Sequence, residues 1–368
     1  MIYNSSLISL SVQYSLQSSP FFILPVMLMN SQFYFNFFSY KNIYSSIIRS
    51  PAHSCLFFSN SQFSYLLSPA IYLTNENENT IIRDKAFHEK QYNFTSGITI
   101  INCELTYCSP VSGEKINDGG TIAINSDIPL VAKYCIFRQN SAHGYGGAIS
   151  VEQSHLVKIE GCLIAENSAQ SNGALYIRDC GKIDMKQSNF TLNKAKTSVG
   201  AASLRSISDG FDISFCILSE NSARMSGTLY IFASMGNIDD CSFYNNDIFH
   251  GASSIKALNN VTVKIRRTIF SEKSPAVSFA KKNDVEIIKC RFANPQNFDI
   301  EKVFDVKIIV SEDNEFNSNL SYNKIELPPL KPLYDNDEEF KIVENDRKQI
   351  NEKRYLRKPT PIIRKTLD

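Results

Sequence analysis

The sequence predicts an all-β fold, a right-handed parallel β-helix of about nine or ten coils, and two observations predict it. A step that contains glycine recurs every 24–27 residues through the middle of the chain. A second motif, an apolar residue followed by two variable residues and asparagine, runs in phase with the first. No stretch between these motifs keeps a helical period of 3.6, so each repeat is expected to hold short strands joined by turns.

The glycine step consists of a turn residue, glycine, a small residue and an apolar residue, and it is clearest at Gly146–Ile149. Copies stand 27 residues earlier at Gly119–Ile122 and 26 residues later at Asn172–Leu175, and fainter copies at Ser68–Ile71 and Ser274–Val277 extend the series. Glycine at such a corner suits a positive φ or a close approach of backbones. The glycines that we assign to the repeat are Gly146, Gly147, Gly173, Gly200, Gly227 and Gly251.

The asparagine motif stands five to six residues before each central glycine step. Stacked coils place equivalent residues above one another. We therefore expect a ladder of side-chain amides, in which each amide bonds its neighbour and the backbone of the turn. The residues assigned to this motif are Phe137, Asn140, Asn167, Phe190, Asn193, Asn221, Phe243 and Asn246.

Within one repeat, about three short stretches are rich in β-branched or aromatic residues, in the clearest coil residues 135–137, 148–151 and 156–159. Such a unit cannot bury its apolar side alone, but stacked copies make a continuous core. A cysteine often opens the asparagine motif, as Cys135 and Cys162 do. The chain has nine cysteines and no Cys-x-x-Cys pair, so we interpret them as small buried apolar residues, with a disulfide or a ligand role as the alternative.

Three regions are predicted: an N-terminal cap or irregular segment at 1–40, the β-helix at 41–325, and a charged, mobile tail at 326–368. The apolar run Pro20–Met29 is too short to span a membrane and lacks the flanks of a signal peptide. We expect a buried strand or capping segment there and no integral membrane segment. Lys and Arg total 38 against 37 Asp and Glu, so the net charge creates no field that would attract nucleic acid, and we expect no nucleic-acid partner. We also expect a monomer.

The motif pair resembles the repeats of the polymorphic membrane protein (Pmp) family. The family pattern is complete at Phe137–Asn140 with Gly146–Ile149, and partial in four further coils between about residues 95 and 280. It is also similar to the wider group of pectin-lyase-like β-helices. The resemblance implies a stacked helix and adhesion at the cell surface, where a protein or a carbohydrate would be the ligand. The chain departs from the family after residue 326, where no series of alternating ten-residue strands follows.

An enzyme of the pectin-lyase-like group is the alternative. Polygalacturonase-like enzymes carry Asn-Thr-Asp, Asp-Asp, Gly-His-Gly and Arg-x-Lys motifs on successive coils. Asp239-Asp240 and His250-Gly251 match two of these in part, but they lie about half a coil apart, and the other two motifs are missing. We therefore interpret the two aspartates as turn residues.

Pectate-lyase chemistry would need clustered carboxylates for calcium and a basic residue. The candidates stand in turn regions of neighbouring coils, and we favour solvated turn carboxylates; they are Asp179, Asp184, Asp209 and Asp212. The five histidines fall in unrelated phases of the repeat. The sequence thus predicts no catalytic, metal or cofactor-binding residue, and favours a non-enzymatic scaffold that binds a ligand through one face.

Overall fold

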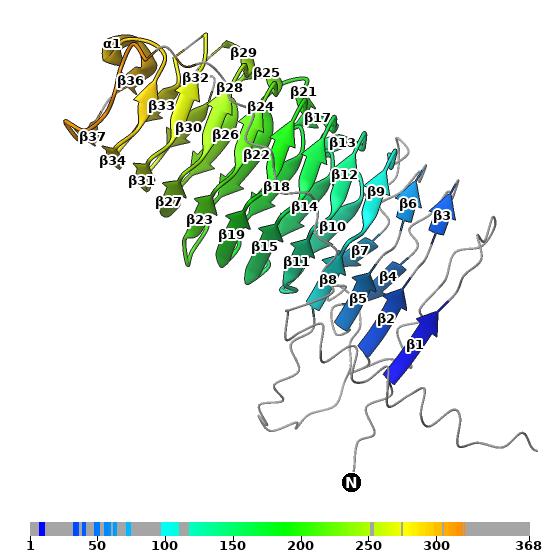
Figure 1. Cartoon of the computed structure of the whole chain (residues 1–368). Coiled ribbons are helices and arrows are strands. Elements are labelled where there is room, and N and C mark those ends of the chain that lie inside the picture. The colour runs from blue at the N-terminus through cyan, green and yellow to red at the C-terminus, as the bar shows by residue number, and fades with distance from the viewer. Residues whose placement is uncertain are drawn as a thin grey trace, which may run out of the picture. The chain divides into compact units, whose positions relative to one another are not determined.

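The computed structural model describes the backbone of strands β1 to β7 and the side chains of residues 98–109, 118–250, 254–273, 275–302, 305–318 and 320 (Figure 1). The chain divides into two units, Met1–Leu327 and Pro328–Asp368. The predicted charged tail at 326–368 lies outside the described residues, and so does Gly251.

The described chain is a parallel β-solenoid, which confirms the predicted fold class. Each turn runs through sheet A, sheet B and sheet C before it returns to sheet A. From β11 to β36 the chain completes about seven successive turns. The only helix among the described residues is α1 (Gln296–Asp299), a single turn.

Sheet A contains twelve parallel strands in chain order. They are β1 (Leu7–Ser11), β2 (Gln32–Asn36), β5 (Cys55–Ser59), β8 (Gly97–Ile101), β11 (Leu130–Lys133), β15 (Leu156–Glu160), β19 (Lys182–Lys186), β23 (Phe211–Ser214), β27 (Met235–Asp239), β31 (Thr262–Arg266), β34 (Asn283–Ile288) and β37 (Val306–Val310). Strands β1 and β2 belong to the predicted cap at 1–40, whose boundary stays a prediction.

Sheets B and C contain ten parallel strands each. Sheet B comprises β3 (Ser39–Lys41), β6 (Gln62–Ser64), β9 (Glu104–Thr106), β12 (Ile136–Arg138), β16 (Leu163–Ala165), β20 (Asn189–Thr191), β24 (Ile217–Ser219), β28 (Ser242–Tyr244), β32 (Ile269–Ser271) and β35 (Arg291–Phe292). Sheet C comprises β4 (Ile48–Pro51), β7 (Ile71–Thr74), β10 (Ile122–Asn125), β14 (Ile149–Glu152), β18 (Leu175–Arg178), β22 (Val199–Arg205), β26 (Gly227–Phe232), β30 (Ile255–Leu258), β33 (Val277–Ala280) and β36 (Ile300–Val303).

A fourth sheet, sheet D, adds one strand between sheets B and C in five coils, where the repeat predicted three strands. Its strands are β13 (Ser141–Tyr145), β17 (Ser168–Ser171), β21 (Lys194–Ala195), β25 (Ser222–Met225) and β29 (Asp247–His250). These are the coils in which five to six residues separate the asparagine motif from the glycine step, so there is enough chain for one more short strand.

The predicted amide ladder is present at the corner between sheets B and D. In each step, the Oδ1 of one asparagine accepts hydrogen bonds from both the backbone N–H and the Nδ2 of the asparagine one coil earlier. For Asn140 and Asn167, both distances are 3.0 Å. The second Nδ2 hydrogen of Asn140 goes to the carbonyl of Leu105, at 2.9 Å. The same pattern continues through Asn193, Asn221 and Asn246, so these buried amides satisfy one another.

The repeat glycines serve close packing and turn geometry, as predicted. Gly146 has a φ of +64° and Gly227 one of +124°, which favour glycine. A Cβ on Gly147 would lie 2.2 Å from the carbonyl oxygen of Gly173, and one on Gly173 would lie 2.2 Å from that of Gly200. Gly200 has more room, since its nearest neighbour would be 3.3 Å away.

One large apolar core fills the described solenoid, and a small second cluster of Ala195, Ala223 and Ile248 lies under sheet D. The motif phenylalanines Phe137, Phe190 and Phe243 point into it from sheet B and are at most 1% exposed. Eight cysteines are buried and free, which confirms their interpretation as small apolar residues within the described part of the chain. Burial raises the pKa of the Cys180 and Cys290 thiols to about 11, so these thiols are poor nucleophiles.

Candidate functional site

The four aspartates considered for calcium separate into two pairs. Asp184 and Asp212 are neighbours on β19 and β23 of sheet A, so the prediction that they stand in turns is wrong for this pair. Lys186 lies 3.1 Å from Asp184, and Lys182 lies 2.5 Å from Asp212. The second pair, Asp179 and Asp209, stands at the corner between sheets C and A. Among the residues that the structure describes, no group of three His, Cys, Asp or Glu side chains is arranged to hold a metal ion.

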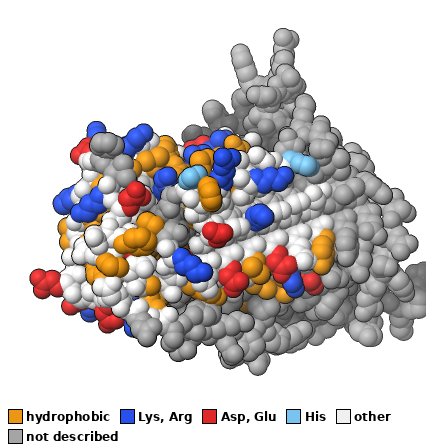
Figure 2. Space-filling view, turned by 90° about the horizontal axis from the view of Figure 1, so that it is seen from above, with side chains coloured by type: hydrophobic (Ala, Val, Ile, Leu, Met, Phe, Trp, Pro, Cys, Tyr) orange, Lys and Arg blue, Asp and Glu red, His pale blue; other side chains and the backbone are white. Residues whose placement is uncertain are grey.

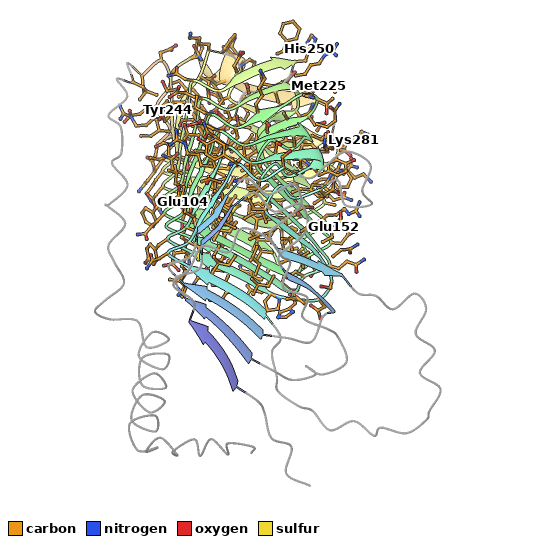
Figure 3. All side chains as sticks on the ribbon, turned by 90° about the vertical axis from the view of Figure 1, so that its right-hand side faces the viewer. Glu104, Glu152, Met225, Tyr244, His250 and Lys281 are labelled. Carbon is orange, nitrogen blue, oxygen red and sulfur yellow. The ribbon has the colours of Figure 1, made fainter. Side chains whose placement is uncertain are left out.

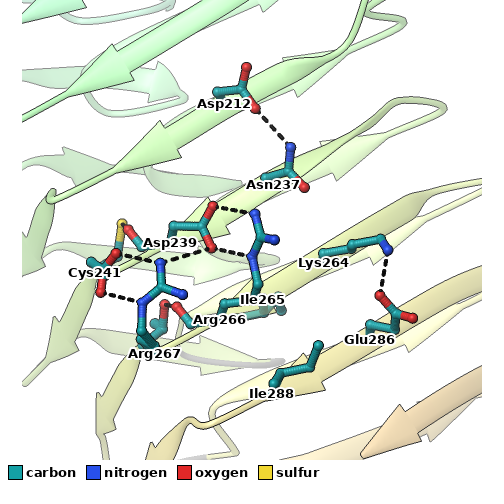
Figure 4. Close-up of polar contacts among 12 residues, drawn as sticks. Asp212, Asn237, Asp239, Cys241, Lys264, Ile265, Arg266, Arg267, Glu286 and Ile288 are labelled. Atoms are coloured by element: carbon teal, nitrogen blue, oxygen red, sulfur yellow. Dashed lines mark hydrogen bonds and ion pairs between the residues drawn. The ribbon is translucent and has the colours of Figure 1, made fainter.

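Asp239 and Asp240 are engaged in ion pairs with the next coil (Figure 4). The two oxygens of Asp239 accept hydrogen bonds from Arg266 at 2.6 and 2.8 Å. Those of Asp240 accept from Arg267 at 2.8 and 2.7 Å, and this contact lowers the pKa of Asp240. His250 ends β29 of sheet D. Asp239 is the last residue of β27 and Asp240 follows it at a positive φ, so the interpretation as turn residues is right for Asp240 and wrong for Asp239.

A different cluster lies on the outer face of sheet C. Along β18, Leu175 and Ile177 point into the core, so strand alternation turns Tyr176 and Arg178 outward. The registers between β18, β22 and β26 then place Tyr176, Ser203 and Tyr230 in one outer column. The neighbouring outer column contains Arg178, Arg205 and Phe232.

These side chains pack ring against ring and cation against ring. Tyr145, at the end of β13, stacks on Tyr176 with 4.6 Å between the ring centroids and an interplanar angle of 21°. The Arg205 guanidinium lies 5.4 Å from the ring centres of both Tyr230 and Phe232. The Arg178 guanidinium lies 5.8 Å from that of Tyr176. We call this set the tyrosine–arginine cluster; its members are Tyr145, Tyr176, Arg178, Arg205, Tyr230 and Phe232.

The cluster has a buried layer and an exposed layer. Tyr176 is 1% exposed and Tyr230 is 8% exposed, whereas Tyr145 is 40% exposed. Tyr176 therefore supports the ring of Tyr145 from beneath. A ring fixed in this way offers a flat apolar surface to a ligand and loses little conformational entropy when it binds.

Two carboxylates border the cluster. Asp118 accepts a hydrogen bond from the backbone N–H of Tyr145 at 2.7 Å. Glu152 accepts one from Nη2 of Arg178 at 2.6 Å. Burial raises the pKa of both carboxyls, and Arg178 opposes that shift at each of them. The charge of Asp118 raises the pKa of Glu152 further, so the two groups influence one another.

An open groove of about 390 Å³ lies beside the cluster, at the corner between sheets C and A. Asp127, His155, Asp179 and Asp209 line it together with serines and backbone. Nδ1 of His155 lies 2.6 Å from Asp127. Nε of Arg178 lies 3.4 Å from Asp179 and so connects the groove to the cluster. Both features therefore belong to one side of the solenoid.

Figure 3 shows how this side is placed. Glu152 of sheet C and Met225 of sheet D lie on one side of the solenoid, and Glu104 and Tyr244 of sheet B lie on the opposite side. The cluster side combines a supported aromatic ring, guanidinium groups and carboxylates next to an open groove. This combination can pack against a sugar ring and hydrogen-bond its hydroxyl groups.

The sequence interpretation did not find this cluster. A signal was present, because Leu-Tyr-Ile occurs twice at the third strand of a coil, at Leu175–Ile177 and Leu229–Ile231. In each copy two apolar residues flank a tyrosine, and an arginine or a phenylalanine follows. Read with a period of two, this pattern places large aromatic and cationic groups on the outside of the sheet.

Comparisons with protein-family models, with curated proteins and with solved structures each find no match. The chain is a parallel β-solenoid with a tyrosine–arginine cluster on the outside of sheet C. The Pmp-like and pectin-lyase-like identities stay resemblances in sequence motifs.

Proposed function

We propose that this chain is a non-enzymatic β-helical scaffold, secreted or at a cell surface, which binds a carbohydrate through the outer face of sheet C. The observation that carries the proposal is the stack of exposed Tyr145 on buried Tyr176. A tyrosine ring held flat against a rigid sheet can pack on the apolar face of a sugar and loses little conformational entropy when it does so.

The surroundings of the ring support a saccharide ligand. Arg178 and Glu152 present charged hydrogen-bonding groups next to it, and the side chain of Arg178 is 44% exposed. Charged donors and acceptors form the stronger hydrogen bonds to hydroxyl groups. A solenoid also repeats its outer face every coil, at about 4.8 Å, which suits an extended polymer better than a small ligand.

The surface location rests on the Pmp resemblance, in which β-helices of this kind act in adhesion. The buried thiols fit that location. Their raised pKa values and their burial protect Cys180 and Cys290 from disulfide exchange in an oxidising compartment.

The test is binding of the full chain to a panel of immobilised neutral and acidic polysaccharides. Tyr145→Ala is expected to weaken binding to the retained polysaccharide about tenfold, which corresponds to loss of one aromatic contact. Phe215→Ala is the matched control, because Phe215 is 58% exposed at the corner between sheets A and B. Equal binding by the Tyr145 variant and the native chain would refute the proposed site, and no retention on any polysaccharide would refute the function.

A carbohydrate-active enzyme of the pectin-lyase-like type is the second candidate. The observation that favours it is the pair Asp118 and Glu152, two carboxyls whose pKa values are raised by burial, that of Glu152 also by the charge of Asp118. Such a pair can supply a general acid and a base to a glycosidic bond. Release of reducing ends or unsaturated sugars, abolished by Glu152→Gln, would replace the scaffold proposal with this one. Binding without any product supports the scaffold.

A further inference from the structure

Many charged side chains on sheets A and B form ion pairs between neighbouring coils. Arg138 of β12 pairs with Glu166 at 2.5 Å, and Lys264 of β31 pairs with Glu286 at 2.8 Å. Further pairs of this kind are Lys182–Asp212, Arg266–Asp239, Arg267–Asp240 and Arg291–Glu315. A ligand that approached these faces would meet compensated charge.

Sheets C and D differ from this pattern. Five cations on or next to these sheets between β21 and β30 form no ion pair within the part of the chain that the structure describes. We call them the basic strip; they are Lys194, Lys196, Arg205, Arg224 and Lys256. The described strands of sheet D contain a single carboxylate, Asp247, at the start of β29. Figure 2 shows Lys and Arg side chains together with Asp, Glu and hydrophobic side chains on the side of the molecule where β25 and β29 lie in Figure 1.

Two of these cations are neighbours on successive coils. Lys194 pairs in register with Ser222, so Lys196 and Arg224 each follow that pair by two residues on neighbouring chain segments. The hydrogen bond from Met225 N–H to the carbonyl of Thr197, 2.9 Å long, keeps the two segments adjacent beyond that pair, with a one-residue shift in register. Both side chains are exposed. Like charges on neighbouring chain segments repel one another, and a bound anion would offset that repulsion.

The strip continues along the solenoid into the tyrosine–arginine cluster. Arg178 has carboxylate partners in Glu152 and Asp179, whereas Arg205 has none within the described residues and lies over two aromatic rings. Lys256 follows Tyr230 in the same outer column. Arg205 and Lys256 stand two coils apart, which is about 10 Å at the usual strand spacing.

We infer that the basic strip, together with the exposed ring of Tyr145, binds an anionic polysaccharide that runs along the solenoid and places its carboxylate or sulfate groups on Arg205, Lys196 and Arg224. The inference rests on the proposed carbohydrate-binding function and names its ligand class. Charge complementarity carries it, since guanidinium and ammonium groups without counter-ions on one side of the molecule select an anion. Phe249, 76% exposed and in register after Arg224, adds an apolar contact at the end of the strip.

The experiment compares three polymers that share one backbone: dextran, carboxymethyl-dextran and dextran sulfate of equal length. The full chain is expected to bind at least one charged polymer more than tenfold more tightly than neutral dextran. The double variant Lys196→Gln/Arg224→Gln is expected to lose about tenfold in affinity for that polymer. Added salt is expected to weaken binding by the native chain more than binding by the variant.

The matched control is Lys158→Gln/Lys264→Gln, which removes the same net charge from paired positions on sheet A. Its affinity is expected to stay within twofold of the native chain. An equal loss in both double variants would show a net-charge effect and overturn the strip. A preference for carboxymethyl-dextran or for dextran sulfate identifies the anion and supports the inference in either case.

Failure of this inference is distinguishable from failure of the proposed function. Binding that depends on Tyr145 but is equal for neutral and charged dextran overturns the anionic ligand and keeps the sugar-binding face. Binding to charged dextran that is unaffected by Tyr145→Ala refutes the tyrosine site, and it supports the strip if the Lys196/Arg224 variant loses affinity. If none of the three polymers binds, the anionic ligand is overturned.

Discussion

The amide ladder and the coils that follow it both provide acceptors for the buried N–H groups of asparagines. The ladder uses amide oxygens, and the later coils use carboxylate oxygens. From Asn140 to Asn246, each side chain donates to the next coil and accepts from the previous one. One coil further on stands Glu272, 5% exposed, whose oxygens accept from the backbone N–H and the Nδ2 of Asn246 at 2.9 and 2.7 Å. The pattern recurs once more, where Asp299 accepts from both nitrogens of Asn294.

The difference shows how a directional ladder ends. An amide carries a donor and an acceptor, so the ladder can continue through any number of coils. An ionised carboxylate only accepts hydrogen bonds, so it satisfies the last donors of the ladder and donates none to the next coil. The terminating position therefore suits a carboxylate, although burial of its charge is costly. This cost is visible at Glu272, where burial raises the pKa to about 7 against hydrogen bonds from Asn246 and Ser254 that lower it.

The largest effect is expected from breaking the ladder in the middle. Asn193→Leu keeps the volume but leaves the N–H and the Nδ2 of Asn167 without an acceptor in a fully buried site. The free energy of unfolding is expected to fall by about 4 kcal/mol, since several buried polar groups lose partners together. Urea unfolding measures the loss. Leu192→Ala, at the adjacent 49% exposed position, is the control and should change stability by less than about 0.5 kcal/mol.

The second prediction is that Glu272 makes the stability of the fold depend on pH. Its folded-state pKa of about 7 lies above the ordinary value of 4.5, so the folded protein binds this proton more tightly than the unfolded chain. The contribution to stability is complete below about pH 4.5 and is lost as the pH rises to 7. At about 1.4 kcal/mol for each pH unit, the loss is about 3 kcal/mol.

Unfolding of the native chain and of Glu272→Gln at pH 4.5, 6 and 7.5 measures this contribution. The variant is expected to show a flatter pH dependence in this window, although its amide nitrogen would face one of the donors of Asn246. Identical slopes for both proteins would contradict the assignment of the pH dependence to Glu272.

The ladder could be predicted from the sequence and its terminator could not, for a specific reason. The motif from Phe137 to Asn140 repeats with fixed spacing, and stacked coils convert fixed spacing into contact. After Phe270 the buried polar residue comes one position earlier and is Glu272. Neither the spacing nor the residue type matches the motif, so only the fold shows the continuity.

The candidate site could not be predicted from the repeat pattern, for a related reason. The repeat describes residues that face the core and the corners, whereas a ligand contacts outer positions that differ from coil to coil. Tyr176, Ser203 and Tyr230 occupy equivalent outer positions, but the three are not all of one residue type. The aspartates that the sequence suggested lie instead in strands and turns, several of them in ion pairs.

A third prediction tests how Glu272 is held. The Ser254 hydroxyl donates to Oε1 at 2.8 Å and, unlike an N–H, can turn to accept a hydrogen bond from a neutral carboxyl. Its hydrogen bond lowers the pKa of Glu272. Ser254→Ala is therefore expected to move the midpoint of the pH-dependent stability to a higher pH and to cost about 1 kcal/mol at pH 7.5. A midpoint that moves downward would show that Ser254 serves the protonated form instead.

The smallest effect is expected from Asp299, which accepts hydrogen bonds from Asn294 within one coil. Its charge raises the pKa of Glu272 as the last of several causes. Asp299→Asn removes that charge and is expected to shift the pH midpoint for Glu272 downward by a fraction of a pH unit, measured in the same unfolding series. The asparagine keeps one acceptor for Asn294, so the stability at pH 4.5 should change by less than about 1 kcal/mol. If the midpoint does not move, the charge of Asp299 does not affect the pKa of Glu272, and each of the two carboxyls binds its proton independently.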